Sequence, residues 1–161
     1  MKTDIVDDLF KKYYNEALLY TMALCSSQTT AEDIVQSAFF KALQTSDNEI
    51  HSFKAWLLAV CRNEYFTLLR RGKFLSGTEP DENAADLRES ALDEIIRQEE
   101  YQALYRAIAE LRKEQREVIV LFYFSRLSVR QISGITGNSE SNVKVLLYRA
   151  RAALKKEMGE A

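Results

Sequence analysis

The sequence predicts an all-α protein in which two small helical domains are joined by a flexible acidic linker. Its 161 residues include one proline and five glycines, and residues that favour helices are abundant. Apolar residues recur at the spacing of one helix face along most of the chain. The net charge is −1 over residues 1–71, −6 over residues 72–100 and +5 over residues 101–161. This division predicts a near-neutral domain, an acidic connection and a basic domain.

The first domain is expected over residues 1–72 and has three helices. A run of apolar residues at helix period covers Asp4–Cys25. The capping-box pattern Thr29–Glu32 then opens a second helix that reaches Leu43. A polar loop follows, and Ser52 caps a third helix that ends at Arg71.

The third helix carries two arcs of side chains. The first, expected in the core, consists of Phe53, Trp56, Leu57, Val60, Cys61 and Leu68. The second consists of Arg62, Tyr65, Phe66 and Leu69, with Arg70 and Arg71 at the end. Aromatic rings interleaved with arginines suit single-stranded nucleic acid, because rings stack on unpaired bases and cations hold the backbone. Packing of this arc on the first two helices is the alternative, and periodicity alone favours it.

The linker is expected over residues 73–90, which include Gly77 and Pro80. The second domain is expected over residues 91–161 and has four helices. Helical periodicity runs to Leu111 and resumes over residues 114–124. The last two helices follow in a helix-turn-helix layout.

The helix-turn-helix covers residues 128–158. Ser128 and Gln131 form a capping box for a short helix that stops at Gly137, and Ser139 caps a longer one. One side of the longer helix is apolar, with Val143, Leu146, Leu147, Ala150, Leu154 and Met158. The opposite side carries Lys144, Val145, Tyr148, Arg149, Ala152, Lys155 and Lys156. Such a face can lie in a DNA major groove. The alternative is a helical hairpin whose lysine-rich face is only solvated.

Other classes of function have little support in the sequence. The one histidine, His51, lies in a polar loop, and there is no glycine-rich phosphate loop or nucleophile–base pattern, so we expect neither an enzyme nor a cofactor. Cys25 and Cys61 fall at apolar helix positions and are expected to be buried free thiols, with no metal site. No apolar run is long enough to span a bilayer and no signal peptide is recognisable, so we expect a cytoplasmic protein.

Four stretches, in order, resemble the small extracytoplasmic-function (ECF) sigma factors of bacterial RNA polymerase. The first is Ala31–Gln36 followed by Phe39, and the second is Phe53–Leu57 followed by Arg62-Asn63. The third runs from Leu111 to Ile132 and includes Gln115–Val118, Tyr123-Phe124 and Leu127-Ser128. The fourth is Asn142–Lys144 followed by Tyr148–Arg151 and Leu154.

The resemblance implies a protein that directs core polymerase to promoters for a stress or signal regulon, held in check by an anti-sigma factor. It implies binding of the polymerase clamp helices by Asp33, Gln36, Ser37 and Phe40. It implies contact with the −10 element by Asn48, Arg62, Asn63, Tyr65, Phe66 and Arg70. It implies contact with the −35 element by Lys144, Val145, Tyr148, Arg149 and Lys155, and of the second domain with the polymerase flap. It implies no small-molecule substrate and no insertion into a membrane.

The chain departs from the family pattern at a few positions. Ser37-Ala38 stands where Glu-Thr is usual, and Arg112 stands where proline is usual. Val145-Leu146 replaces Ser-Arg, which makes the centre of the recognition face less polar. The alternative function is a stand-alone helix-turn-helix regulator that binds duplex DNA as a dimer, but it leaves residues 31–71 without a purpose.

Overall fold

The computed structural model describes residues 2–45, 52–72 and 99–159, which form seven α-helices and no strand. The expected all-α class is confirmed. Contacts divide the chain into two compact units, Met1–Ala84 and Ala85–Ala161. The division falls within the residues expected to form the linker, which lie outside the described ranges, so the boundaries predicted at residues 73 and 90 stay predictions.

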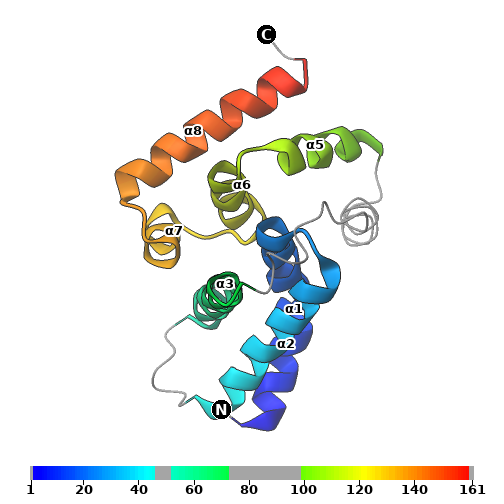
Figure 1. Cartoon of the computed structure of the whole chain (residues 1–161), viewed down its shortest axis with the longest axis vertical. Coiled ribbons are helices and arrows are strands. Elements are labelled where there is room, and N and C mark those ends of the chain that lie inside the picture. Colours follow the sequence, from blue (N-terminus) through cyan, green and yellow to red (C-terminus); the bar gives the residue numbers. More distant parts are fainter. Residues whose placement is uncertain (1, 46–51, 73–98, 160–161) are drawn as a thin grey trace. The chain divides into compact units, whose positions relative to one another are not determined.

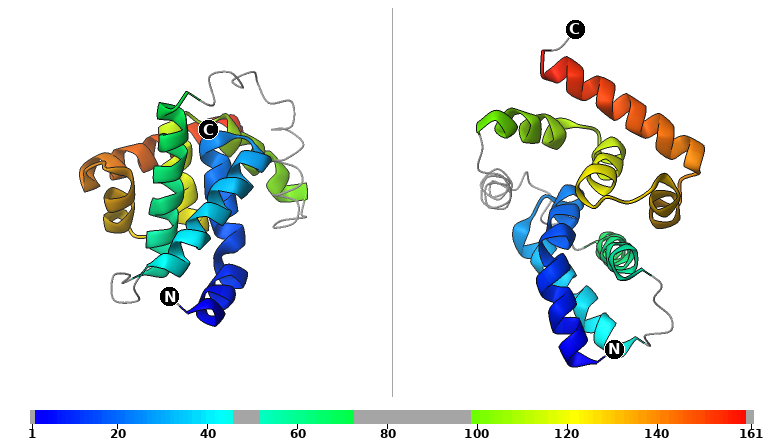
Figure 2. Two further views of the ribbon diagram at one scale, coloured as in Figure 1. Left: turned by 60° about the horizontal axis from the view of Figure 1, so that its bottom comes forward. Right: turned by 180° about the vertical axis from the view of Figure 1, so that it is seen from behind.

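The N-terminal unit is a bundle of α1 (Thr3–Cys25), α2 (Gln28–Gln44) and α3 (Phe53–Arg70). The three helices contact one another pairwise, and α1 and α2 lie side by side (Figure 1). Figure 2 shows the same bundle from two further directions. Its core is built from Val6, Ala17, Tyr20, Met22, Leu24, Ala31, Ile34, Val35, Ala38, Phe39, Ala42, Leu57, Leu58, Cys61 and Tyr65. Each helix is therefore held by two others, which fixes the side that it presents to solvent.

The start of α2 differs from the expectation. The helix begins at Gln28, and its cap is Ser27, whose hydroxyl accepts a hydrogen bond from the Thr30 backbone N–H. The predicted cap at Thr29 is wrong, because α1 ends in a left-handed turn at Ser26 (φ 56°) that brings Ser27 into the capping position. Only two residues separate the helices, which makes α1 and α2 a tight hairpin.

The third helix begins as expected, with the Ser52 hydroxyl accepting from the Ala55 backbone N–H. Its buried side consists of Leu57, Leu58, Cys61 and Tyr65. The predicted core arc is therefore partly wrong. Leu58 and Tyr65 are buried instead of four members of that arc, which are only half-buried: Phe53, Trp56, Val60 and Leu68. Phe53 instead joins a set of stacked rings, 5.9 Å from the ring centres of Tyr13, Phe39 and Trp56.

The C-terminal unit contains α5 (Glu99–Glu110), α6 (Lys113–Ile119), a π-helical turn η2 (Val120–Phe124), α7 (Val129–Thr136) and α8 (Glu140–Glu157). Within this unit α8 contacts α5, α6 and α7 (Figure 1). Its buried side chains Val143, Leu147 and Ala150 complete a core that is otherwise made by Tyr105, Ala107, Ile108, Leu111, Val118, Ile119, Val120, Leu121, Leu127 and Ile132. The apolar side of α8 is confirmed except at Met158, which is exposed because the end of the helix extends beyond the core.

The predicted caps of the helix-turn-helix are confirmed. The Ser128 hydroxyl accepts from the Gln131 backbone N–H at 3.1 Å, and the Gln131 Oε1 accepts from the Ser128 backbone N–H at 3.0 Å. The short helix stops at Gly137, whose φ of 80° suits a residue without Cβ. The Ser139 hydroxyl then accepts from the Asn142 backbone N–H. The turn that sets α8 against α7 is thus specified by local sequence.

The helix predicted over residues 114–124 is interrupted. After Ile119 the backbone widens into the π-helical turn, and the Ser125 N–H donates to the Val120 carbonyl at 3.1 Å. The chain then passes through a left-handed residue, Arg126 (φ 57°). Two rings of this turn contact Arg151 of α8: Phe122 is half-buried and Tyr123 is exposed.

Both cysteines are free, but they differ in burial. Cys61 is buried in the N-terminal core, as expected, whereas Cys25 is only half-buried at the end of α1. Burial raises the pKa of the Cys61 thiol from 9.0 to about 12; Thr21 lowers it through a hydrogen bond and Glu64 raises it by charge. The thiol is therefore protonated in the folded protein near neutral pH.

We expect Cys61 to resist alkylation while the protein is folded, because only the thiolate is nucleophilic. A Cys25→Ala variant leaves Cys61 as the one thiol for iodoacetamide. Mass spectrometry should show an unmodified native chain at pH 8 and still very slow labelling at pH 9 to 10, since the thiolate appears only as the pH approaches 12. Labelling should be fast in urea. A native rate equal to the rate in urea would contradict the buried position of the thiol.

Candidate DNA- and polymerase-binding surfaces

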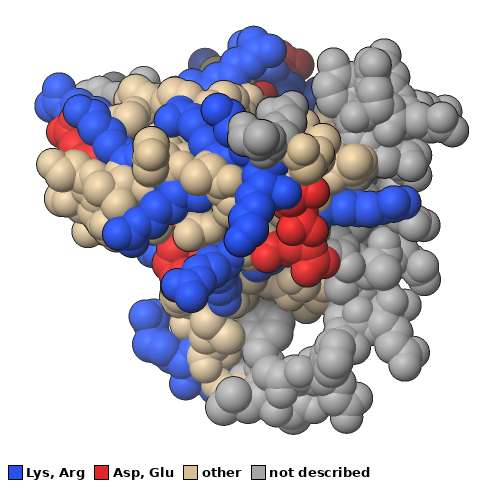
Figure 3. Space-filling model, turned by 90° about the horizontal axis from the view of Figure 1, so that it is seen from above, with Lys and Arg blue, Asp and Glu red and all other residues tan. Residues whose placement is uncertain are grey.

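The exposed side of α8 is a basic surface around an aromatic ring. Lys144, Arg149 and Lys155 are exposed, and Tyr148 is 73% exposed. We call this set, together with Val145, the recognition face. Figure 3 views the molecule from the α8 end of Figure 1 and shows Lys and Arg side chains spread over that face. All five residues predicted for the −35 element thus lie on one side of one helix, where they can reach a duplex together.

Arg151 has a structural contact that its place in the sequence did not indicate. Its Nε donates to the Tyr123 hydroxyl at 2.7 Å. Its guanidinium carbon lies 5.6 Å from the ring centre of Phe122 and 5.5 Å from that of Tyr123. We call this the Arg151 clasp. The clasp ties α8 to the π-helical turn. The sequence shows the aromatic pair Phe122-Tyr123, but it does not show which arginine contacts these rings.

The residues predicted to bind polymerase form one stripe along α2. Asp33, Gln36, Ser37 and Phe40 are spaced so that they share a side of the helix. Asp33 and Gln36 are exposed, Ser37 is half-buried and Phe40 is 60% exposed. Leu43, also exposed, extends the apolar end by one turn and was not predicted. A carboxylate at one end and a phenyl ring at the other suit a partner surface with a basic and an apolar part.

The −10 residues are only partly brought together by α3. Arg62, Asn63, Phe66 and Arg70 lie along one side, with Asn63 and Arg70 exposed and the other two half-buried. The Arg62 guanidinium carbon lies 4.6 Å from the centre of the Phe66 ring. The Arg70 Nη2 donates to the Thr67 hydroxyl at 3.1 Å. Asn48 lies outside the described residues.

Tyr65 is a correction to the predicted −10 set. Its side chain is 4% exposed and belongs to the buried side of α3. Its ring meets that of Phe66 edge to face at 5.1 Å between centres. A base cannot stack on a buried ring, so Tyr65 supports Phe66 from behind.

The two surfaces of the N-terminal unit are joined by an ion pair. The Lys41 Nζ, next to Phe40 on α2, contacts the Glu64 Oε1, next to Asn63 on α3. Both side chains are partly solvated, so the pair adds little to stability. It does link the two helices at the point where their exposed sides meet.

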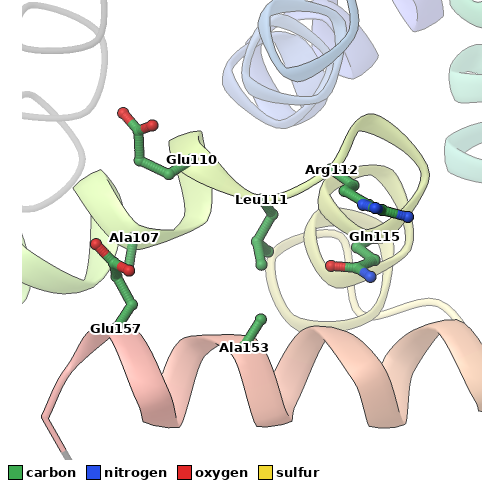
Figure 4. A pocket seen from close by; sticks show the side chains of 7 residues that line it. All are labelled: Ala107, Glu110, Leu111, Arg112, Gln115, Ala153 and Glu157. Carbon is green, nitrogen blue, oxygen red and sulfur yellow. The ribbon is translucent and has the colours of Figure 1, made fainter.

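A small pocket of about 270 Å³ lies within the C-terminal unit, between the α5–α6 junction and α8. Figure 4 shows Leu111 and Ala153 at its centre, with Ala107, Glu110, Arg112, Gln115 and Glu157 around them. Its two carboxylates against one guanidinium make it unsuitable for phosphate. Among the described residues no His, Cys, Asp and Glu side chains group to hold a metal ion, and none of the described helices is long and apolar enough to cross a membrane.

Comparison with known proteins decides the family. Residues 9–74 match Sigma-70 region 2, and residues 101–154 match Sigma-70, region 4. The RNA polymerase sigma factor YlaC of Bacillus subtilis is 31% identical over 96% of this chain and 92% of its own length. The ECF RNA polymerase sigma factor SigM of the same organism is 30% identical over 93% of each chain. The chain belongs to the ECF sigma factors.

Solved structures of similar fold agree. The sigma factor RpoE in its complex with the anti-sigma factor NepR, from Bartonella quintana, gives a TM-score of 0.68 at 23% identity and covers 94% of this chain and 97% of its own. CnrH in complex with the cytosolic domain of CnrY gives 0.67 at 22% identity, covering 98% of this chain and 90% of its own. The alternative of a stand-alone helix-turn-helix regulator is set aside, because the match to region 2 accounts for the N-terminal unit.

We expect the Arg151 clasp to contribute to the stability of this sigma factor, whereas Arg149, two residues away and also exposed, should not. Arg151→Ala should lower the free energy of unfolding of the C-terminal unit by about 1 kcal/mol, since it removes a hydrogen bond and two ring contacts. Tyr123→Phe, which keeps the ring, should have a smaller effect.

Arg149→Ala is the matched control and should change the free energy of unfolding by less than about 0.5 kcal/mol. Urea unfolding of the full chain, followed by circular dichroism, measures all three variants. Equal effects of the two arginine substitutions would show that the clasp does not hold α8.

Proposed function

We propose that this ECF sigma factor brings core RNA polymerase to its promoters through three surfaces: the recognition face of α8 on the −35 element, the stripe on α2 on the polymerase clamp helices, and α3 with its preceding loop on the −10 element. The observation that carries the proposal is that one chain combines a basic helix-turn-helix with a second unit whose two exposed surfaces lie on neighbouring helices. Initiation needs these activities in one molecule, because polymerase must be held while DNA is recognised and melted.

The C-terminal unit has the charge and shape for duplex DNA. Lys144, Arg149 and Lys155 supply cations for phosphates, and Arg149 can also form paired hydrogen bonds with a guanine edge. Tyr148 adds a large ring with a hydroxyl that can donate or accept. The apolar side of the same helix is buried, so its exposed side is presented in a fixed orientation.

The N-terminal unit supports a role in opening the −10 element. Phe66 and Arg62 form a stacked pair at the surface of α3, and Asn63 beside them can hydrogen-bond to a base edge. An unpaired base can stack on such a pair, and a neighbouring cation can hold its phosphate. Asn48 and the residues around it would add contacts from the loop before α3.

The proposed partners follow from these surfaces and from the relatives. They are core polymerase, through its clamp helices and flap, and promoter DNA. An anti-sigma protein is proposed because the similar structure of RpoE is a complex with the anti-sigma factor NepR. The regulon is proposed to respond to stress or to another signal. We propose no cofactor, small-molecule substrate or catalytic residue, and the place of action is the cytoplasm, where polymerase works.

Run-off transcription tests the proposal. Core polymerase is assayed with and without the full chain on DNA from upstream of its own gene. A defined transcript should appear only when both proteins are present, and the chain alone should bind the duplex weakly. If purified chain neither binds core polymerase nor starts transcription on any template, the proposal is wrong.

Two substitutions should distinguish the function of the recognition face from that of the stripe on α2. Arg149→Ala should reduce initiation from a −35-dependent promoter by about tenfold and leave the affinity for core polymerase unchanged, because it removes one base or phosphate contact. Asp33→Ala should instead weaken binding to core polymerase, measured by fluorescence anisotropy of labelled chain.

The controls are Arg106→Ala in α5 and Asp8→Ala in α1, which remove exposed charges away from these surfaces. Both should behave as the unaltered chain does. Loss of core binding in Arg149→Ala would mean that the assignment of surfaces is incorrect.

A further inference from the structure

We propose that Val145 determines part of the promoter preference by contacting the methyl group of a thymine in the −35 element. The inference rests on the proposed function, because it assumes that the recognition face lies in the major groove. It names the base, and the group on that base, that one residue of the recognition face contacts.

The position of Val145 on α8 is the first support. It lies two residues from Val143 and two from Leu147, and both of these side chains are buried. Two residues turn an α-helix by about 200°, so Val145 lies almost diametrically opposite the core. Its side chain is 42% exposed. When this helix lies in a groove, the residue opposite the core comes closest to the base edges.

The residues on either side of Val145 are the second support. Lys144 and Lys155 lie on one edge of the recognition face; Arg149 lies on the other, with Lys156, outside the recognition face, beside it. A helix in the major groove has a phosphate strand along each edge, so the lysines on both edges have an anionic partner. The centre between them, where Val145 and Tyr148 lie, carries no charge and is then directed at the floor of the groove, not at phosphates.

The chemistry of valine is the third support. Its side chain neither donates nor accepts a hydrogen bond, and the apolar group that base pairs expose in the major groove is the thymine methyl. A branched residue at an exposed helix position also has a lower helix propensity than the lysines and alanines around it. Val145 therefore contributes to neither the core nor the helix, whereas a thymine methyl would cover its exposed surface.

Arg149 lies one turn beyond Val145 on the same face. A side chain one turn along reads a neighbouring base pair, and the best partner of arginine is guanine. The recognition face therefore favours a thymine close to a guanine.

The test uses the holoenzyme and templates whose −35 and −10 regions are both randomised, with several spacer lengths. Sequencing of the transcribed templates should show a thymine preference in the −35 region. That thymine is then replaced by deoxyuridine, which removes the methyl group alone. Initiation by the unaltered protein should fall about fourfold, the effect of uncovering one methyl group.

Val145→Ser, which places the residue usual in the family, should still initiate but should no longer distinguish thymine from deoxyuridine. Ile5→Ser is the matched control, because Ile5 is an aliphatic residue with a similar exposure of 41% in the other unit. It should keep the fourfold discrimination.

The outcomes separate the two claims. Absence of transcripts from every template with the unaltered chain would contradict the proposed function itself. Transcription that shows no thymine preference, or no loss with deoxyuridine, would overturn the role of Val145 alone. The same holds if Val145→Ser discriminates as well as the unaltered protein does.

Discussion

Burial of one side of α8 is the constraint on which the DNA-binding surface depends. Val143, Leu147 and Ala150 are enclosed by the other helices of the C-terminal unit, and this sets the rotation of α8 about its axis. Most of the stability of a helix in a protein comes from packing of its apolar side, so the same contacts also keep α8 folded. These buried side chains therefore determine the direction in which the exposed cations of α8 point.

A comparable arrangement governs the N-terminal unit, although it serves two surfaces. Because α1, α2 and α3 contact one another pairwise, the stripe on α2 and the exposed side of α3 have fixed orientations. Tyr65 shows how the core contributes: it fills the space behind Phe66 and holds that ring at the surface. If Phe66 contacts the −10 element as proposed, substitution of Tyr65 would act on DNA through Phe66.

The sequence predicted best those features that depend on neighbours within one helical turn. The caps at Ser52, Ser128 and Ser139 and the stop at Gly137 were all correct, because a cap is set by a hydroxyl and an N–H a few residues apart. Ser27 was missed because the choice between two nearby hydroxyls depends on the left-handed turn at Ser26. The recognition face could be listed in full before the structure was known, since opposite sides of one helix follow from period alone.

Features that depend on distant residues could not be predicted in this way. Periodicity alone favoured packing of the arc that contains Tyr65, whereas the family resemblance placed Tyr65 among the DNA contacts; its burial shows that packing holds for this ring. The Arg151 clasp joins residues far apart in the sequence, and it depends on a π-helical turn that no local sequence pattern predicts. Asn48 and the linker lie outside the described residues, and their roles stay predictions.

On α8, different residues hold the helix and face outward, and this affects how the promoter preference of such a protein can change. The residues that hold the helix and those proposed to face the promoter are different sets, and Arg151 is the one exposed arginine of α8 seen to hold the helix in place. Substitutions at the outward positions therefore leave the fold nearly untouched. After a gene duplication, a copy could acquire a new set of target genes in single steps, without first passing through an unstable intermediate. The paired surfaces of α2 and α3, which share one bundle and an ion pair, have much less freedom to change.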